Sequence, residues 1–305
     1  MVGTGFFSLP VQEYLTFMNT EKPVVGRYAR IIMDHWFKRT FGEQKNSKRL
    51  LQLFLQELIP EHRIVELSYA NTEHSNPFSD NKDVRIDVEC TDADGTRFVV
   101  EMQLAGQRHF YERAVFNSTF AIQQQTLKGE RDYDFPTVYF IGLMDFSFHG
   151  PASRVDYRYL LRERDSGEPM TPRIQYIFLE LPNSLDRALQ PGASVLDNFC
   201  YALHMMEHLT ERPAELKQEI FRLLFDSAEI ATFTPEEKAK YELDMTTERD
   251  RINQLAYAEE KGRAEGARQQ ALMTAKAFLR MGLSAEMVAQ GTGLSLEEVQ
   301  RLQSE

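Results

Sequence analysis

The sequence predicts an α/β protein: a core with a mixed central sheet flanked by helices, followed by an α-helical C-terminal region. Three observations indicate this fold class. Two runs of alternating apolar and polar residues flank an Asp-Gly turn within 84–104, which is typical of a β-hairpin. A helical pattern and then a continuous apolar run follow, as in a β-α-β crossover. Beyond about residue 190 the pattern is helical throughout.

The composition is that of a globular protein. Of the 305 residues 42% are hydrophobic and 27% charged. Apolar runs such as 138–144 are too short to cross a bilayer, and the first residues lack the basic and apolar parts of a signal peptide. Two cysteines are too few for a disulfide framework or a zinc site. We therefore expect a cytoplasmic protein that does not bind membranes.

Two helices and a strand are predicted before the hairpin. Residues 27–41 carry an apolar stripe with helical spacing, which predicts the first helix. Ser47 is the expected N-cap of a second helix, which Pro60 ends. Residues 64–67 indicate a strand, and 71–81 a polar loop.

The register of the hairpin follows from its pattern. Residues directly opposite each other on the two strands lie on the same face of the hairpin. The apolar residues of both strands therefore share one face only if the residue numbers of each opposed pair add up to an even value. A three-residue loop, Ala93-Asp94-Gly95, meets this condition, with the glycine supplying a positive φ. This register places Asp87 opposite Glu101, with Gln103 one pleat further along.

The core continues with a helix and buried strands. Residues 107–128 predict a helix, and 138–143 a strand buried on both faces, parallel to the strand that carries Glu101. Residues 174–181 predict one more strand. We expect the α/β core to occupy 20–185.

The C-terminal region divides into two expected parts. Helices at 195–209, at 214–226 and from 235 onward form a helical region at 190–260. The remainder, 261–305, is a charged linker at 261–268 and short helices capped by Ser284 and Ser295. These short helices superficially resemble a helix-turn-helix, but Arg301 is the one basic residue from 282 to the end. Binding a partner or forming a homo-oligomer fits this tail better than binding DNA.

The facing carboxylates of Asp87 and Glu101 are the candidate site. Cross-strand neighbours lie about 5 Å apart at Cβ, so the two acids repel unless a positive charge lies between them. A hard divalent cation such as Mg²⁺ takes oxygen ligands of this kind. Acids on the polar face of a hairpin are, as the alternative, often simply solvated.

A resemblance to a known family supports the metal interpretation. Segments 34–42, 82–90, 94–95 and 100–103, together with Arg113, resemble the Rpn family of recombination-promoting nucleases, also described as PD-(D/E)XK nuclease family transposases. The similarity is close over about 24–150 and extends loosely to the C-terminus. It implies a restriction-endonuclease-like core and a Mg²⁺-dependent DNA endonuclease, with Mn²⁺ as a substitute, acting in DNA recombination or mobilisation.

The resemblance also implies roles for individual residues. Asp87 and Glu101 become the metal-binding acids, and Gln103 takes the position where the wider superfamily has lysine. A carboxamide can orient a water molecule but carries no charge. Arg85, on the same strand face as Asp87, or Lys82 just upstream would supply the missing positive charge.

The remaining candidates have two interpretations each. Asp34 either reaches the metal shell or pairs with Lys38 four residues later. Arg113 either binds a phosphate or forms an ion pair. The basic patch within 27–49, which includes Lys38 and Arg39, meets DNA phosphates or is a solvated helix face.

Three functions remain open on the sequence. The first is the nuclease. The second is a catalytically weak DNA-binding or regulatory protein that keeps the fold, suggested by Gln103 and by the net charge of −11. The third is an assembly protein that associates through its C-terminal helices. RNA remains an alternative substrate, since nothing in the site reads a 2′-hydroxyl.

Overall fold

A mixed six-stranded sheet flanked by helices forms the first part of the chain, and helices form the rest, which confirms the predicted fold class. The structure, a computed structural model, describes residues 26–70, 73–74, 84–106, 109–125, 135–150 and 154–304. Contacts divide the chain into two compact units, Met1–Phe233 and Thr234–Glu305.

The strands run in the order β1-β4-β5-β6-β8-β7. Strands β5, β6 and β8 are parallel, and the other neighbouring pairs are antiparallel. Two further short strands, β2 and β3, pair with each other. Their bounds are β1 Leu67–Tyr69, β2 Glu73–His74, β3 Val84–Arg85, β4 Val88–Asp92, β5 Arg97–Gln103, β6 Val138–Met144, β7 Asp156–Leu160 and β8 Ile174–Glu180.

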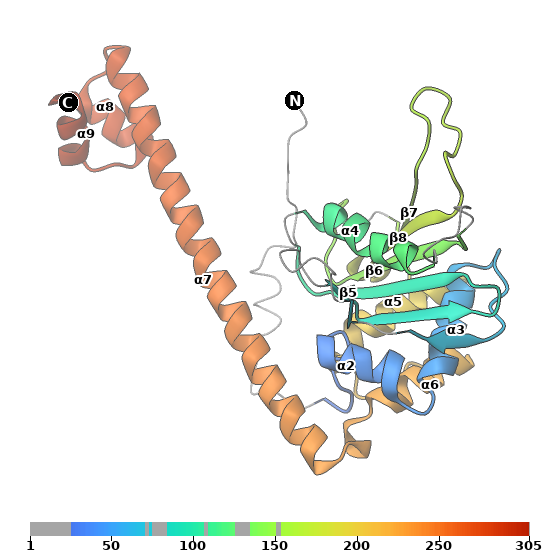
Figure 1. Ribbon diagram of the computed structural model, residues 1–305. Helices are drawn as coiled ribbons and strands as arrows, with labels where there is room; N and C mark the ends of the chain where they lie inside the picture. Colours follow the sequence, from blue (N-terminus) through green and yellow to red (C-terminus); the bar gives the residue numbers. More distant parts are fainter. Residues whose placement is uncertain are drawn as a thin grey trace. The chain divides into compact units, whose positions relative to one another are not determined.

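Helices cover both faces of the sheet (Figure 1). Helix α4 (Phe110–Gln123) connects β5 to β6 and packs its buried Phe110, Ala114 and Ala121 on one face. The opposite face is covered by α3, α5 and α6, and Phe54 of α3 stacks on Phe199 of α5. The bounds are α2 Asp34–Lys38, α3 Ser47–Leu58, α5 Val195–Met205 and α6 Glu219–Ala228.

The hairpin of β4 and β5 has the predicted register. Val88 pairs with Val100 and Cys90 with Phe98, so the numbers of opposed residues give the same even sum as Asp87 and Glu101. Gly95 in the three-residue loop has a φ of 87°. The parallel pairing of β5 with β6 is confirmed as well, and every residue of β6 is buried.

The start of the first helix was predicted wrongly. Helix α2 begins at Asp34, seven residues later than expected, and a π-helical turn, Arg39–Glu43, continues it. Tyr28 instead forms a β-bridge with Glu229, and the Ala29 N–H donates to the Ala228 carbonyl at 2.8 Å. The backbone groups that a helix would use are thus taken by a segment 200 residues away in sequence, which no local pattern reveals.

Smaller differences concern element ends. The strand expected at 64–67 lies at Leu67–Tyr69, because the Val65 and Glu66 N–H groups donate to the Asp92 carboxylate instead of a ladder. Asn46 takes the N-cap position before Ser47. Helix α4 is shorter than 107–128, the 71–81 loop lies mostly outside the described residues, and β7 was not predicted.

The second unit is helical from its first residues. Helix α7 (Pro235–Arg280) begins with a capping box on Thr234 and passes without a break through 261–268, so the expected linker is helical. Helices α8 (Ala285–Thr292) and α9 (Leu296–Ser304) pack against its end around Ala275, Val288 and Val299. Ser295 and Glu298 form the predicted capping box.

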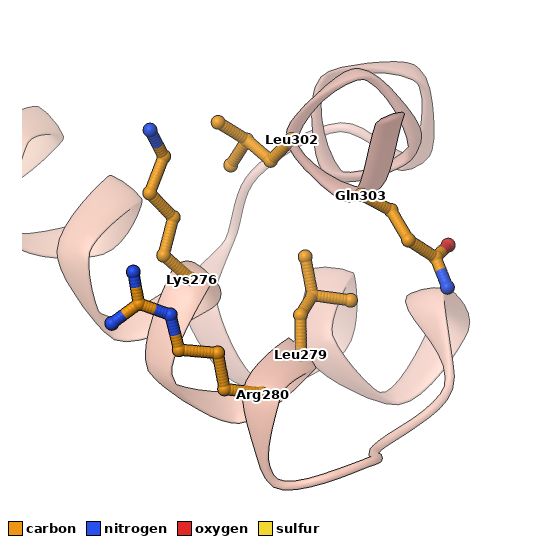
Figure 2. Close-up of a pocket in the computed structure, with 5 residues that line it drawn as sticks. All are labelled: Lys276, Leu279, Arg280, Leu302 and Gln303. Atoms are coloured by element: carbon orange, nitrogen blue, oxygen red, sulfur yellow. The ribbon is translucent and has the colours of Figure 1, made fainter. Parts of the chain in front are cut away.

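A pocket of about 410 Å³ lies between the end of α7 and α9 (Figure 2). Its lining is Lys276, Leu279, Arg280, Leu302 and Gln303. The helices α5 and α6, by contrast, belong to the unit that contains the sheet. The three-part division at 185, 190 and 260 stays a prediction. Within the described ranges, no helix combines the length and the apolar character needed to cross a membrane.

Gly142 on β6 gives a stability prediction, since a Cβ there would lie 2.7 Å from Phe178 Cδ1. We expect Gly142→Ala to lower the free energy of unfolding by about 1–3 kcal/mol, because the Phe178 ring must leave its place in the core. Urea denaturation measures this. Gly42→Ala, in helical backbone with nothing within 4 Å, is the control and should lose no stability. Equal stability of Gly142→Ala and wild type would contradict the packing argument.

Candidate active site

Asp87 lies at the bend just before β4, at the open end of the hairpin. Its Oδ2 accepts the backbone N–H of Met102 at 2.8 Å, and its Oδ1 lies 3.1 Å from Lys38 Nζ. The bond to Met102 ties the carboxylate to β5 beside Glu101. The side chain is 10% exposed, so the charge is largely withdrawn from water.

Glu101 lies on β5 and is 6% exposed. Its Oε1 is buried and has no hydrogen-bond partner among the described residues. A buried carboxylate oxygen without a donor is costly, because it has given up its bonds to water and gained none in return.

Other buried acid side chains near the sheet have partners within the protein. Glu89 lies 2.9 Å from Arg97, Asp145 lies 3.1 Å from Arg30, and Glu180 accepts from His149 Nδ1 at 2.6 Å. Glu89 and Glu180 are fully buried, and the Asp145 side chain is 5% exposed. The contrast with Glu101 indicates that its free oxygen is reserved for a group other than the described side chains.

Burial and repulsion act together on the acid pair. Burial, followed by the neighbouring charge of Asp87, raises the pKa of Glu101 to about 8, while the charges of Arg113 and Lys38 oppose the shift. Burial also raises the pKa of Asp87, against the opposing effects of the Met102 N–H and Lys38. Because the ionised forms are disfavoured here, each acid is stabilised by a proton or by a nearby cation, and a metal ion would have to displace the protons.

Gln103 and Arg113 form a bonded pair next to Glu101. Arg113 on α4 donates to Gln103 Oε1 at 2.5 Å, and Gln103 Nε2 donates to the Ala105 carbonyl at 3.0 Å. Gln103 is 8% exposed. Both ends of its amide are engaged, so it holds the guanidinium of Arg113 at the site.

Lys38 contacts both Asp34 and Asp87, two acids that lie far apart in the sequence. Its ammonium lies 2.6 Å from Asp34 Oδ1 as well as 3.1 Å from Asp87. The structure therefore shows the pairing of Asp34 with Lys38, and it brings that pair to Asp87. Burial lowers the pKa of the Lys38 ammonium, but the effects of Asp34 and Asp87 outweigh it, so the pKa is raised overall.

The other predicted residues either lie apart from this cluster or fall, wholly or in their side chains, outside the described part of the structure. Arg39 stacks over Phe233 at 4.4 Å and donates to the Ser227 carbonyl. Arg85 lies in β3 opposite Glu73, and its side chain is not described. Lys82 lies outside the described residues.

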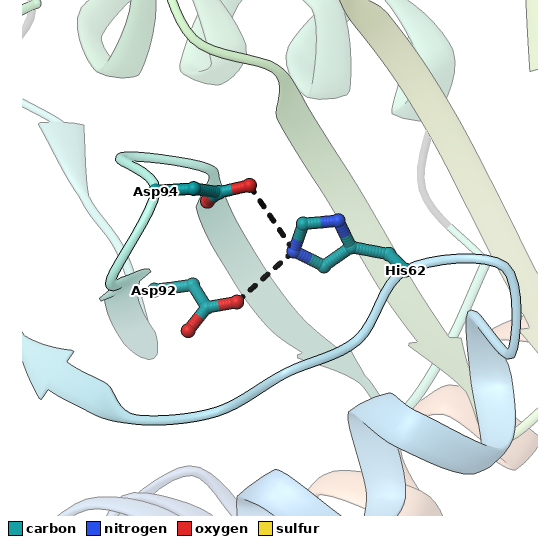
Figure 3. Close-up of side chains that lie close together, drawn as sticks. All are labelled: His62, Asp92 and Asp94. Atoms are coloured by element: carbon teal, nitrogen blue, oxygen red, sulfur yellow. Dashed lines mark hydrogen bonds and ion pairs between the residues drawn. The ribbon is translucent and has the colours of Figure 1, made fainter.

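A second acidic cluster lies at the other end of the hairpin (Figure 3). His62 Nε2 lies 3.0 Å from Asp92 Oδ2 and 3.7 Å from Asp94 Oδ2, and the three groups have the spacing of a metal site. It was missed in the sequence because His62 has no ligand spacing to the two acids. Asp92 already accepts backbone N–H groups from Val65, Glu66 and Ala93, which accounts for its position. It lies about 17 Å along β4 from Asp87, at about 3.4 Å per residue.

The acids at the open end fit a hard divalent cation better. Among the described residues, Glu101 Oε1 has no donor, and Asp87 has Lys38 as its one side-chain cation. Oxygen ligands and an incomplete protein shell are what Mg²⁺ prefers, because it keeps several water molecules.

Comparison with known proteins gives a family for the chain. A family model described as PD-(D/E)XK nuclease family transposase matches residues 31–258, which include α2, the hairpin and α4. No curated protein and no solved structure matches the chain.

The raised pKa of Glu101 predicts a pH-dependent effect of Glu101→Gln. In the folded protein this pKa is about 8, and in the unfolded chain about 4.3. The folded state therefore holds the proton more tightly, and the stability of metal-free wild type falls as the pH rises through this range. We expect Glu101→Gln to be more stable than wild type by about 1 kcal/mol or more at pH 9, and by less at pH 5.

Urea denaturation in EDTA at the two pH values measures the difference. Glu89→Gln is the matched control, since it breaks a buried ion pair with Arg97 and should lose stability at both pH values. A gain for Glu101→Gln that is the same at pH 5 and pH 9 would show that its carboxyl is not the titrating group.

Proposed function

Because the chain belongs to the PD-(D/E)XK nuclease family transposases, we propose that it is a metal-dependent endonuclease that hydrolyses DNA phosphodiester bonds. One observation carries the proposal: the buried carboxylate of Glu101, with an oxygen that no described group satisfies, beside the second buried acid, Asp87. The family supports a nuclease- or transposase-like activity in the coarse sense. The role in DNA recombination or mobilisation, and the residues named below, are part of the proposal.

Asp87 and Glu101 would hold the cation, Mg²⁺ with Mn²⁺ as a substitute. Such a cation supplies Lewis acidity, which polarises a phosphate and makes bound water more acidic. In the hydrolysis a water oxygen bonds to phosphorus and gives up a proton, one bridging P–O bond breaks, and the released oxygen takes up a proton. Asp87 keeps its geometry through the bond to the Met102 N–H, so it presents Oδ1 to the cation without rearranging the strand.

Gln103 contributes through Arg113. Its amide accepts from the guanidinium at 2.5 Å, which places a permanent positive charge near Glu101. Arginine stays protonated under all ordinary conditions and offers several donors in a fixed fork, which suits phosphate oxygens. The uncharged Gln103 is thus compatible with catalysis, because the charge comes from a neighbouring helix. Arg85 and Lys82 remain candidates for further phosphate contacts.

A catalytically weak DNA-binding or regulatory protein is the second candidate. The ion pair of Lys38 with Asp87 favours it, because this contact already neutralises one acid without a metal. The two candidates differ in whether a divalent metal produces cleavage, so one assay separates them.

The cleavage assay uses supercoiled plasmid with Mg²⁺, Mn²⁺ or EDTA. We expect nicking or linearisation in either metal and none in EDTA. Asp87→Asn and Glu101→Gln keep the side-chain shape but remove a charge, and should each lower the rate about 10²-fold or more. Asp94→Asn, in the cluster at the far end of the hairpin, is the control and should cleave normally. A structured RNA of similar length, in the same buffers, tests the alternative substrate.

Two outcomes would count against the nuclease. Wild type that binds DNA but cleaves in neither metal would favour the regulatory candidate. Cleavage that survives both Asp87→Asn and Glu101→Gln would move the active site elsewhere in the chain.

We also propose self-association through the second unit, supported by the exposed apolar side chains of Leu243, Leu255 and Tyr257 on α7. A chain that ends at Phe233 should then sediment as a monomer at concentrations where the full chain is an oligomer. Sedimentation velocity over a concentration series measures both. Cleavage by the shortened chain would show that the two roles are separable, whereas a monomeric full chain would contradict the proposal.

A further inference from the structure

Lys38 lies between an exposed acid and a buried one. Its Nζ is 2.6 Å from Asp34 Oδ1 and 3.1 Å from Asp87 Oδ1. The Asp34 side chain is 74% exposed, the Asp87 side chain 10%, and that of Lys38 itself 21%. The ammonium therefore lies at the boundary between solvent and the acid pair.

The neighbouring residues fix the direction of the lysine. Trp36 is buried and stacks on Phe233 with ring centroids 4.9 Å apart, and Phe37 is buried against Phe41. Helix α2 is only five residues long, so these two aromatic anchors leave its last residue little freedom in where it presents its side chain. Lys38 reaches Asp87 as a consequence of core packing, although the two residues are 49 positions apart.

The chemistry of the Lys38 side chain suits a group that changes its partner. A lysine ammonium has three donors on a flexible stem, whereas the guanidinium of Arg113 is a rigid fork with one arm already bonded to Gln103. The contact with Asp87 also occupies the carboxylate oxygen, Oδ1, that the Met102 N–H leaves open. A divalent cation on Asp87 and the ammonium of Lys38 would therefore compete for the same oxygen.

We propose that Lys38 has two successive roles at this site: it neutralises Asp87 while no divalent metal is bound, and it donates a hydrogen bond to the reacting phosphate once the metal has displaced it. Asp34 is the counter-ion that keeps the ammonium at the site after displacement. This inference rests on the proposed nuclease function. Gln103 carries no charge, so Lys38 on α2 supplies the flexible positive charge that it lacks, while Arg113 supplies a fixed one from α4.

Two opposite effects follow for Lys38→Met, which keeps the length of the side chain and removes its charge. Metal affinity rises, about 5-fold or more, because the competing cation is gone. The cleavage rate at saturating metal falls, about 10²-fold or more, because a donor to the phosphate is lost. Lys38→Arg keeps the charge and should retain more activity than Lys38→Met. Lys217→Met, at an exposed lysine just before α6, is the matched control and should change neither quantity.

Metal binding is measured on the full chain without DNA, by titration calorimetry or by the paramagnetic resonance of free Mn²⁺. This readout does not depend on activity, so it tests the competition even if wild type cleaves nothing. Circular dichroism melting of each variant shows whether it is folded. Should Lys38→Met fail to fold, Lys38→Arg and Lys38→Gln carry the comparison.

The metal affinity and the saturated cleavage rate of Lys38→Met together test the two roles. Higher metal affinity with a lower saturated rate supports the proposal. Higher affinity with an unchanged saturated rate reduces Lys38 to a charge-balancing group and overturns the second role. Lower affinity means that Lys38 positions Asp87 for the metal, which overturns the competition.

Asp34→Asn tests the counter-ion. Without Asp34 the ammonium has Asp87 as its remaining acid, so metal affinity should fall, opposite to the effect of Lys38→Met. In the Lys38→Met background, Asp34→Asn should then change the affinity little, because the effect passes through the lysine. An equal loss in both backgrounds would show that Asp34 acts on the metal itself, and would overturn its role as the counter-ion.

Discussion

The charge of one buried carboxylate, Glu101, is the constraint to which the rest of the site responds. Its neighbour Asp87 is also buried; burial raises the pKa of both acids, and the charge of Asp87 raises that of Glu101 further. Such a pair is stable only if protons or cations compensate it. The described part of the chain supplies two cations, Lys38 and Arg113, and offers no donor to Glu101 Oε1.

The sheet topology explains why the compensation comes from helices. Strand β5 has neighbours on both sides, β4 and β6, so its backbone groups are used in the ladder. A residue at its end can be reached from the connecting helix α4, which supplies Arg113 after the strand, and from α2, which supplies Lys38. The core positions both helices: α4 through Phe110 and α2 through Trp36. Apolar packing therefore sets the electrostatics of the site.

The sequence was sufficient to predict what depends on local pattern. Residue parity and the Asp-Gly turn gave the hairpin register, and thereby the relation of Asp87 to Glu101, while the apolar run at 138–144 gave a buried parallel strand. The sequence did not predict that the polar face of the hairpin is buried. Alternation implied a solvated face, but Glu89 and Glu101 are covered because the sheet extends beyond the hairpin and α4 lies over it. The contact of Lys38 with Asp87 and the bridge from Tyr28 to Glu229 join distant segments, so no periodicity could show them.

The charge balance of the site bears on how an acidic protein would act on DNA under the proposed function. With their carboxyl groups ionised, Asp34, Asp87 and Glu101 outnumber Lys38 and Arg113 by one negative charge, and the whole chain carries −11. In this state the site repels a phosphodiester. A divalent cation on the acids would reverse the local sign to one positive charge and, by displacing Lys38 from Asp87, would expose an ammonium to the phosphate. The overall acidity then has little influence at the reacting bond, since distant surface charges are screened within about 8 Å at physiological salt. Metal binding and substrate binding are coupled in this arrangement, because the same event that completes the metal shell creates the positive field that a phosphate requires.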